Sequence, residues 1–122
     1  MTVEDTDTID SIGMSPDGSA YTLLMVEPRP FKMSEEQAEQ IREKINTYIY
    51  AIQTGQLYQM FPEMAGKELT VRLVCMDEPR HPHLLELLSI ATRLFNKHGA
   101  RFVVEVIPPE FVKGGREFFD SA

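Results

Sequence analysis

The sequence predicts an α+β two-layer sandwich in which a four-stranded mixed sheet carries two helices on one face. Three observations lead to this prediction. Apolar residues alternate in some segments and recur at helical spacing in two others, these segments follow one another in the order ββαβαβ, and the connections between them are short. A chain of 122 residues without a linker or an internal repeat suits one core. We therefore expect a single domain over 1–122, with a frayed N-terminus over 1–7, a core over 8–107 and a C-terminal tail over 108–122.

The first two strands are expected to form a β-hairpin. A weak strand candidate over 8–14 precedes Ser15-Pro16-Asp17-Gly18, whose proline in second place and glycine in fourth are typical of a tight turn. The second strand covers 19–27. Two prolines in 28–33 remove backbone donors, so this segment is predicted to be an extended connector.

The first helix is predicted over 34–54. Ser34 and Gln37 have the spacing of a capping box, and Gly55 is a natural stop. The helix should bury one apolar stripe, because these residues recur at helical spacing: Ala38, Ile41, Ile45, Tyr48, Ile49 and Ile52.

The second half of the chain contains a strand, a helix and a strand after a connecting segment. We predict a loop over 56–67 that packs against the core, a third strand over 69–76, a second helix over about 83–97 and a last strand over 101–107. A strand–helix–strand unit favours parallel strands joined by a right-handed crossover.

The sheet face away from the helices is expected to be too apolar for free exposure to solvent. The C-terminal tail, with Phe111, Val112, Phe118 and Phe119, is one possible cover, and a second copy of the protein is another. The face could also stay exposed. A homodimer interface on this face would use Arg72, Val74, Met76, Val103, Glu105 and Ile107.

Composition and charge argue against several classes of function. Nineteen acidic and twelve basic residues give a net charge of −7, which opposes approach to nucleic acid and to anionic membranes. No apolar run approaches the roughly 20 residues of a membrane-spanning helix, and no export signal is recognisable, so we expect a cytoplasmic location. Cys75 is the only cysteine, so no intrachain disulfide forms, and its position in a strand predicts a buried, unreactive thiol.

No motif of nucleotide binding or of serine hydrolysis occurs in the chain, and no cofactor is expected. The most suggestive cluster is Asp77, His81 and His83, with Glu78 and Glu86 nearby, at the junction of a strand end and a helix start. Imidazole and carboxylate suit transition metals, yet His-Pro-His lacks a third histidine at a ligand spacing. The cluster is therefore a weak metal candidate, and the alternative is a solvated polar loop.

The segment Lys44-Ile45-Asn46-Thr47-Tyr48, with the helix exit Gly55-Gln56-Leu57, resembles a family of small bacterial domains of unknown function. The start Ile9-Asp10-Ser11-Ile12-Gly13 is similar as well, so the likeness covers about residues 8–107. The resemblance implies a bacterial cytoplasmic α+β domain and transfers no catalytic residue or cofactor. Relatives carry an aromatic-rich segment, often with tryptophan, after the hairpin, whereas this chain has Pro28-Arg29-Pro30-Phe31 and no tryptophan.

Our leading hypothesis is a non-enzymatic protein-interaction domain. Complementary charge speeds association, so an acidic helix face could bind a basic partner, as bacterial immunity proteins do; its residues are Glu35, Glu36, Glu39 and Glu43. One alternative is a small ligand- or metal-binding domain or enzyme that uses Asp77, His81 and His83. Another is a structural homodimer subunit joined through the sheet face.

Overall fold

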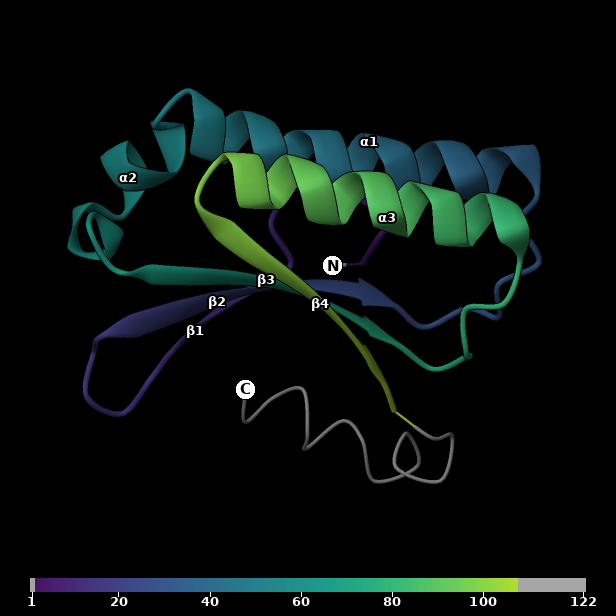
Figure 1. Cartoon of the computed structure of the whole chain (residues 1–122), viewed down its shortest axis with the longest axis horizontal. Helices are drawn as coiled ribbons and strands as arrows, with labels where there is room; N and C mark the ends of the chain where they lie inside the picture. The colour runs from purple at the N-terminus through teal and green to yellow at the C-terminus, as the bar shows by residue number, and fades with distance from the viewer. Residues whose placement is uncertain (1, 108–122) are drawn as a thin grey trace.

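Four strands form one mixed sheet in the computed structural model, which describes residues 2–107 (Figure 1). They are β1 (Ser11–Met14), β2 (Ala20–Glu27), β3 (Glu68–Cys75) and β4 (Ala100–Val106), in the spatial order β1-β2-β3-β4. β1 pairs antiparallel with β2, whereas β2 with β3 and β3 with β4 are parallel. The mixed sheet and the parallel pairing of the last two strands are as predicted.

The two long helices lie side by side on one face of this sheet (Figure 1). They are α1 (Glu35–Gln53) and α3 (Pro82–Lys97), and both boundaries agree closely with the predicted ranges. The described order is thus β-β-α-α-β-α-β, because a short helix follows α1. Between residues 2 and 107, no helix combines the length and the apolar character needed to cross a lipid bilayer.

The prediction of a loop over 56–67 was wrong in part. This segment contains α2 (Gln56–Met60) and a 3₁₀ turn over Pro62–Met64. Gly55 takes a left-handed conformation with φ of 78°; α1 ends just before it, as predicted, and the chain turns there into α2. Leu57 and Met64 are buried, so the segment packs against the core as expected.

The core fills the space between the helices and the sheet. Phe95 of α3 stacks on Phe102 of β4 with ring centroids 5.3 Å apart, which fixes α3 over this edge of the sheet. The predicted apolar stripe of α1 contributes Ile41, Ile45, Tyr48, Ile49 and Ile52, and the strands contribute Leu23, Met25, Val71 and Leu73.

The start of α1 differs from a reciprocal capping box. The Ser34 hydroxyl accepts from the Gln37 amide N–H at 3.1 Å, as predicted. The Gln37 side chain, however, accepts from the backbone N–H of Met33 and donates to the carbonyl of Pro30. Gln37 is buried, so it holds the proline-rich connector against the helix instead of capping Ser34.

The first residues of the chain are held against the sheet, whereas we expected residues 1–7 to be frayed. Val3 is fully buried, and its backbone N–H donates to the carbonyl of Val26 at 2.8 Å. The Thr47 hydroxyl donates to the carbonyl of Thr6. Residues 2–7 therefore pack as part of the folded domain.

The hairpin turn is organised by one carboxylate. Asp17 Oδ1 accepts from the Ser15 hydroxyl at 2.8 Å, from the Ser19 hydroxyl at 2.7 Å and from the Ser19 amide at 3.0 Å. These hydrogen bonds, those from Ser19 first, lower the pKa of Asp17 to about 2. Gly18 completes the turn with a φ of 73°.

Candidate functional site

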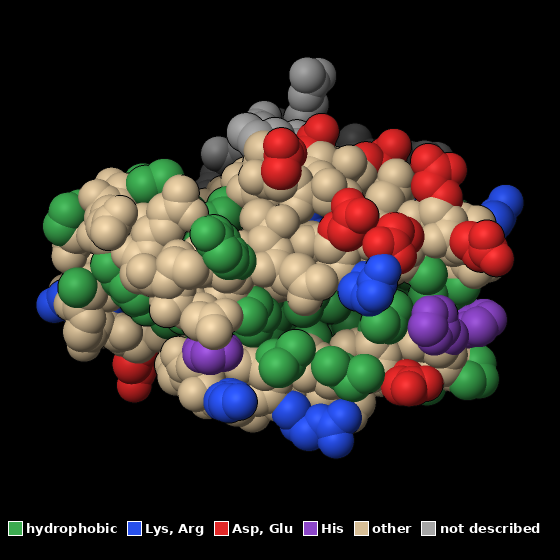
Figure 2. All heavy atoms as spheres, turned by 90° about the horizontal axis from the view of Figure 1, so that it is seen from above, with side chains coloured by type: hydrophobic (Ala, Val, Ile, Leu, Met, Phe, Trp, Pro, Cys, Tyr) green, Lys and Arg blue, Asp and Glu red, His purple; other side chains and the backbone are tan. Residues whose placement is uncertain are grey.

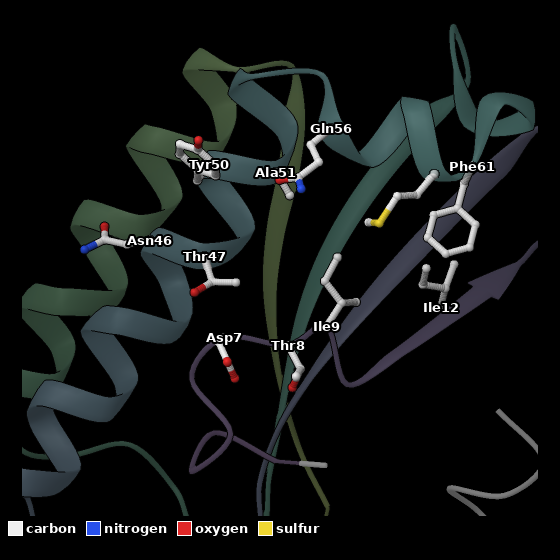
Figure 3. A pocket seen from close by; sticks show the side chains of 11 residues that line it. Asp7, Thr8, Ile9, Ile12, Asn46, Thr47, Tyr50, Ala51, Gln56 and Phe61 are labelled. Carbon is white, nitrogen blue, oxygen red and sulfur yellow. The ribbon is translucent and has the colours of Figure 1, made fainter.

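A groove opens between β1 and the carboxyl-terminal half of α1 (Figure 3). It encloses about 760 Å³, within the range of clefts that bind ligands. Ile9 and Ile12 line the groove from the side of β1, and Ala51 lines it from α1. The other lining residues are Asp7, Thr8, Asn46, Thr47, Tyr50, Gln56, Met60 and Phe61.

Two large apolar side chains of this groove are exposed to solvent. Tyr50 has 62% and Met60 has 55% of its surface accessible. Exposed apolar side chains are ordinary when scattered, but here they share one concave surface with Ile12. The groove therefore offers apolar area that a partner could bury.

A buried ion pair holds one wall of the groove in place. The Lys44 ammonium donates to Asp10 Oδ1 at 2.6 Å and to the carbonyls of Asp5 and Thr8, each at 2.6 Å. The Lys44 side chain is completely buried. Thr8 lines the groove. Lys44 therefore fixes the segment over 5–10, which forms one wall of the groove.

Tyr48 completes what we call the Asp10–Lys44–Tyr48 cluster. Its hydroxyl accepts from the Asp10 backbone N–H at 2.9 Å and donates to the carbonyl of Leu24. The second carboxylate oxygen of Asp10 accepts from the Val26 N–H at 2.8 Å. Desolvation raises the pKa of Tyr48 well above its ordinary value. These groups join the start of the chain, β2 and α1, which is a structural role.

The burial of Lys44 was not predicted from the sequence. Gln37, Ile41, Lys44 and Tyr48 are spaced by four, three and four residues, so Lys44 occupies a position on the buried stripe of α1. A charged residue on such a stripe is the signal that could have revealed it, since a buried charge requires a partner.

Glu27 is a second buried charge that the sequence analysis did not find. Its carboxylate accepts from Arg29 Nε at 2.6 Å and from Arg29 Nη2 at 2.8 Å. The side chain of Glu27 is fully buried, and this pairing raises the pKa of Arg29. The ion pair fixes the chain where β2 passes into the proline-rich connector.

The predicted acidic face of α1 is exposed. Figure 2, which looks onto the helical layer, shows acidic side chains gathered along one side and hydrophobic side chains between the helices. Arg42 pairs with Glu39 at 2.5 Å, and both side chains are about half exposed. The whole predicted set is accessible: Glu35, Glu36, Glu39 and Glu43.

The sheet face away from the helices carries a small second apolar cluster. Val74 and Ile107 are buried together with Leu24, and Met76 packs against them. Arg72 and Glu105 form a salt bridge of 3.3 Å across β3 and β4. Val103 is half-buried on the same face. The proposed aromatic cover over 108–122 lies outside the described residues.

The three weak metal candidates have separate roles in the structure. Asp77 Oδ2 accepts from the Phe31 backbone N–H at 2.9 Å, and His81 Nδ1 accepts from the His83 N–H at 3.2 Å at the start of α3. His83 lines a shallow groove between α1 and α3. Within the described part of the chain, no group of three or more His, Cys, Asp or Glu side chains is placed to hold a metal ion.

Cys75 is a buried thiol at the end of β3, as expected. Its burial, with smaller contributions from Asp77 and Glu27, raises the pKa of the thiol to about 12. The thiolate needed for nucleophilic chemistry is therefore rare at neutral pH.

A layer of helices on a four-stranded sheet defines a small α+β domain with an apolar groove. The Asp10–Lys44–Tyr48 cluster joins the start of the chain to α1 and to β2. The chain belongs to a family of unknown function (DUF6572), whose sequence model matches residues 1–108. This confirms the resemblance to a family of unknown function. Neither a search of curated proteins nor a search of solved structures found a match.

Proposed function

We propose that this protein is a non-enzymatic, cytoplasmic protein-interaction domain that binds a basic partner. The observation that carries the proposal is the distribution of charge on α1. Its exposed face carries Glu35, Glu36, Glu39 and Glu43. Of these four glutamates, Glu39 pairs with Arg42. Such a surface steers a cationic partner during diffusional encounter.

The groove beside α1 supports the same proposal. Among the described residues, Asp7 is the only charged one that lines it, and Tyr50 and Met60 supply exposed apolar area. A basic partner could thus be attracted by α1 and then bury an apolar segment in the groove. Association by steering followed by apolar burial is typical of specific protein interfaces.

The test begins with the isolation of a partner from a lysate of the source organism. The untagged protein is the bait, and the pull-down is carried out at low and at moderate salt concentration. The association rate of the partner is then measured by stopped flow with a variant in which glutamine replaces Glu35, Glu36, Glu39 and Glu43. We expect the rate at low salt to fall by about an order of magnitude, with a weaker dependence on salt.

The matched control changes the net charge by the same amount on other surfaces. It replaces exposed glutamates outside α1 by glutamine: Glu63, Glu68, Glu78 and Glu86. The control should slow association much less. Equal rates for the two variants, or a rate that does not depend on salt, would contradict a steering role for α1.

A further inference from the structure

In the part of the chain that the structure describes, no strand pairs with the outer edge of β1, which we call its free edge. This edge presents backbone groups that can pair with another strand. The Ser15 N–H donates to the carbonyl of Ala20 at 2.9 Å, which identifies Ser15 and Ala20 as a hydrogen-bonded pair. Hydrogen-bonded and non-bonded pairs alternate along antiparallel strands, so Gly13 and Ser11 direct their N–H and C=O groups toward β2. The same groups of Ile12 and Met14 point outward, away from the sheet.

The free edge has a defined end. Asp10 precedes the paired residues of β1, and its N–H donates to the buried Tyr48 hydroxyl at 2.9 Å, so this N–H is already used. Asp7 and Thr8 line the groove at the same end. Within the described residues, the edge available for pairing therefore extends from Ile12 to Met14.

This edge borders the groove described above. Ile12 pairs with Leu23, whose side chain is in the core below the helices, so the Ile12 side chain points to the same face and lines the groove (Figure 3). A strand added about 4.8 Å outside β1 would project alternate side chains into the groove. There they would meet Tyr50 and Phe61.

Charge decides which occupant fits. Asp7 lines the groove, the acidic face of α1 lies on the same helix as Tyr50, and no lysine or arginine of residues 2–107 lines the groove. The chain itself carries a net charge of −7, which disfavours a second copy at this position. An extended segment with aliphatic and basic side chains complements both the apolar walls and the carboxylate.

We infer that the basic partner adds an extended strand to the free edge of β1, with aliphatic side chains in the groove and a basic side chain near Asp7. This inference rests on the proposed function, because it specifies how the basic partner binds. Strand addition gives affinity through main-chain hydrogen bonds and specificity through the pockets for alternate side chains.

The first test uses a labelled probe peptide, Lys-Thr-Val-Thr-Val-Thr-Lys, and fluorescence anisotropy. In an extended peptide the two valines and the two lysines share one face. N-methylation of one alternating set of amides should reduce affinity by about tenfold, and methylation of the other set should leave it nearly unchanged, because only one set points to β1. Replacing both lysines by glutamate should abolish binding.

The second test changes the protein. Met14→Pro removes an outward N–H that no described residue uses, and proline is tolerated on the outer side of an edge strand. This variant should bind the probe about tenfold more weakly, whereas Met14→Val, which keeps the N–H, should bind it nearly as well as the wild type. Asp7→Asn should lower the affinity for the probe and leave the affinity for a lysine-free Thr-Val peptide unchanged.

Several outcomes would overturn the inference. These are no binding of the probe, equal effects of the two methylation patterns, and equal affinity for Met14→Pro and Met14→Val. Dimerisation that Met14→Pro abolishes would assign the edge to a second copy. If the glutamine variant of α1 slows partner association while Met14→Pro has no effect on it, the proposed function stands and strand addition at β1 is wrong.

Discussion

Lys44 Nζ lies 2.6 Å from Asp10 Oδ1, although the two side chains are 0% and 1% exposed. Removing these two charges from water is costly, and the carbonyls of Asp5 and Thr8 and the N–H of Val26 compensate by hydrogen bonding. The pair thus connects α1 to the first ten residues and to β2. It is a determinant of stability that also shapes the groove.

Removing one partner of this pair should be far more destabilising than removing an exposed cation. Lys44→Met leaves the Asp10 carboxylate buried without its counter-ion, so we expect the free energy of unfolding to fall by about 3–5 kcal/mol. Arg42→Met, in the exposed pair with Glu39, should cost about 0–1 kcal/mol. Urea denaturation measures both values, and equal losses would contradict the role of the buried pair.

The hydroxyl of Tyr48 should contribute measurably to stability. Tyr48→Phe leaves the N–H of Asp10 and the carbonyl of Leu24 without this partner, so we expect a loss of about 1–3 kcal/mol. Tyr50→Phe is the matched control, because Tyr50 is 62% exposed, and its cost should be close to zero. Thermal unfolding of the two variants under one condition makes the comparison, and a harmless Tyr48→Phe change would refute this assignment.

Cys75 should react with thiol reagents only when the protein opens. Its pKa of about 12 leaves little thiolate at pH 8, and its side chain is fully buried. Alkylation by iodoacetamide, followed by mass spectrometry, should be slow in buffer and rapid in concentrated urea. Rapid modification in buffer would show that β3 opens locally or that the thiol is accessible.

The hairpin turn should stabilise the protein in a way that depends on pH. The pKa of Asp17 is lowered to about 2, so its carboxylate contributes stability above its unfolded pKa of 3.8, and this contribution is lost as the pH falls through about 2. The difference in melting temperature between wild type and Asp17→Ala should therefore be largest near pH 6 and should shrink between pH 4 and 2. Glu63→Ala is the control for the loss of one exposed carboxylate. A difference that grows toward low pH would contradict this sign.

The pattern of apolar residues was sufficient to predict the sheet and the two long helices. Alternation in β3 and the stripe of α1 indicate which side chains enter the core. In β4 the alternation predicts a core position correctly for Phe102 but not for Val104 and Val106, which are 37% and 41% exposed. The short α2 was not predicted, because Gln56 to Met60 is too brief for helical periodicity and follows a glycine that usually ends a helix.

The groove could not be predicted in the same way. Its walls come from four separate stretches, which include Thr8, Ile12, Tyr50 and Phe61, and only the docking of α1 against β1 brings them together. Burial of Lys44 was detectable in principle from its place on the stripe. Its partner was not, because Asp10 lies outside any element with a regular period.

The anchoring of the first residues also has a consequence for the order of events during synthesis. Asp10 leaves the ribosome 34 residues before Lys44, a delay of roughly 2–7 s at ordinary rates of translation. The hairpin of β1 and β2 can form in microseconds, well within this interval. The Asp10 carboxylate can accept from the Val26 N–H at this stage, but it lacks its counter-ion until α1 emerges. The contacts of residues 5–10 with α1 therefore form only after the hairpin has had time to fold.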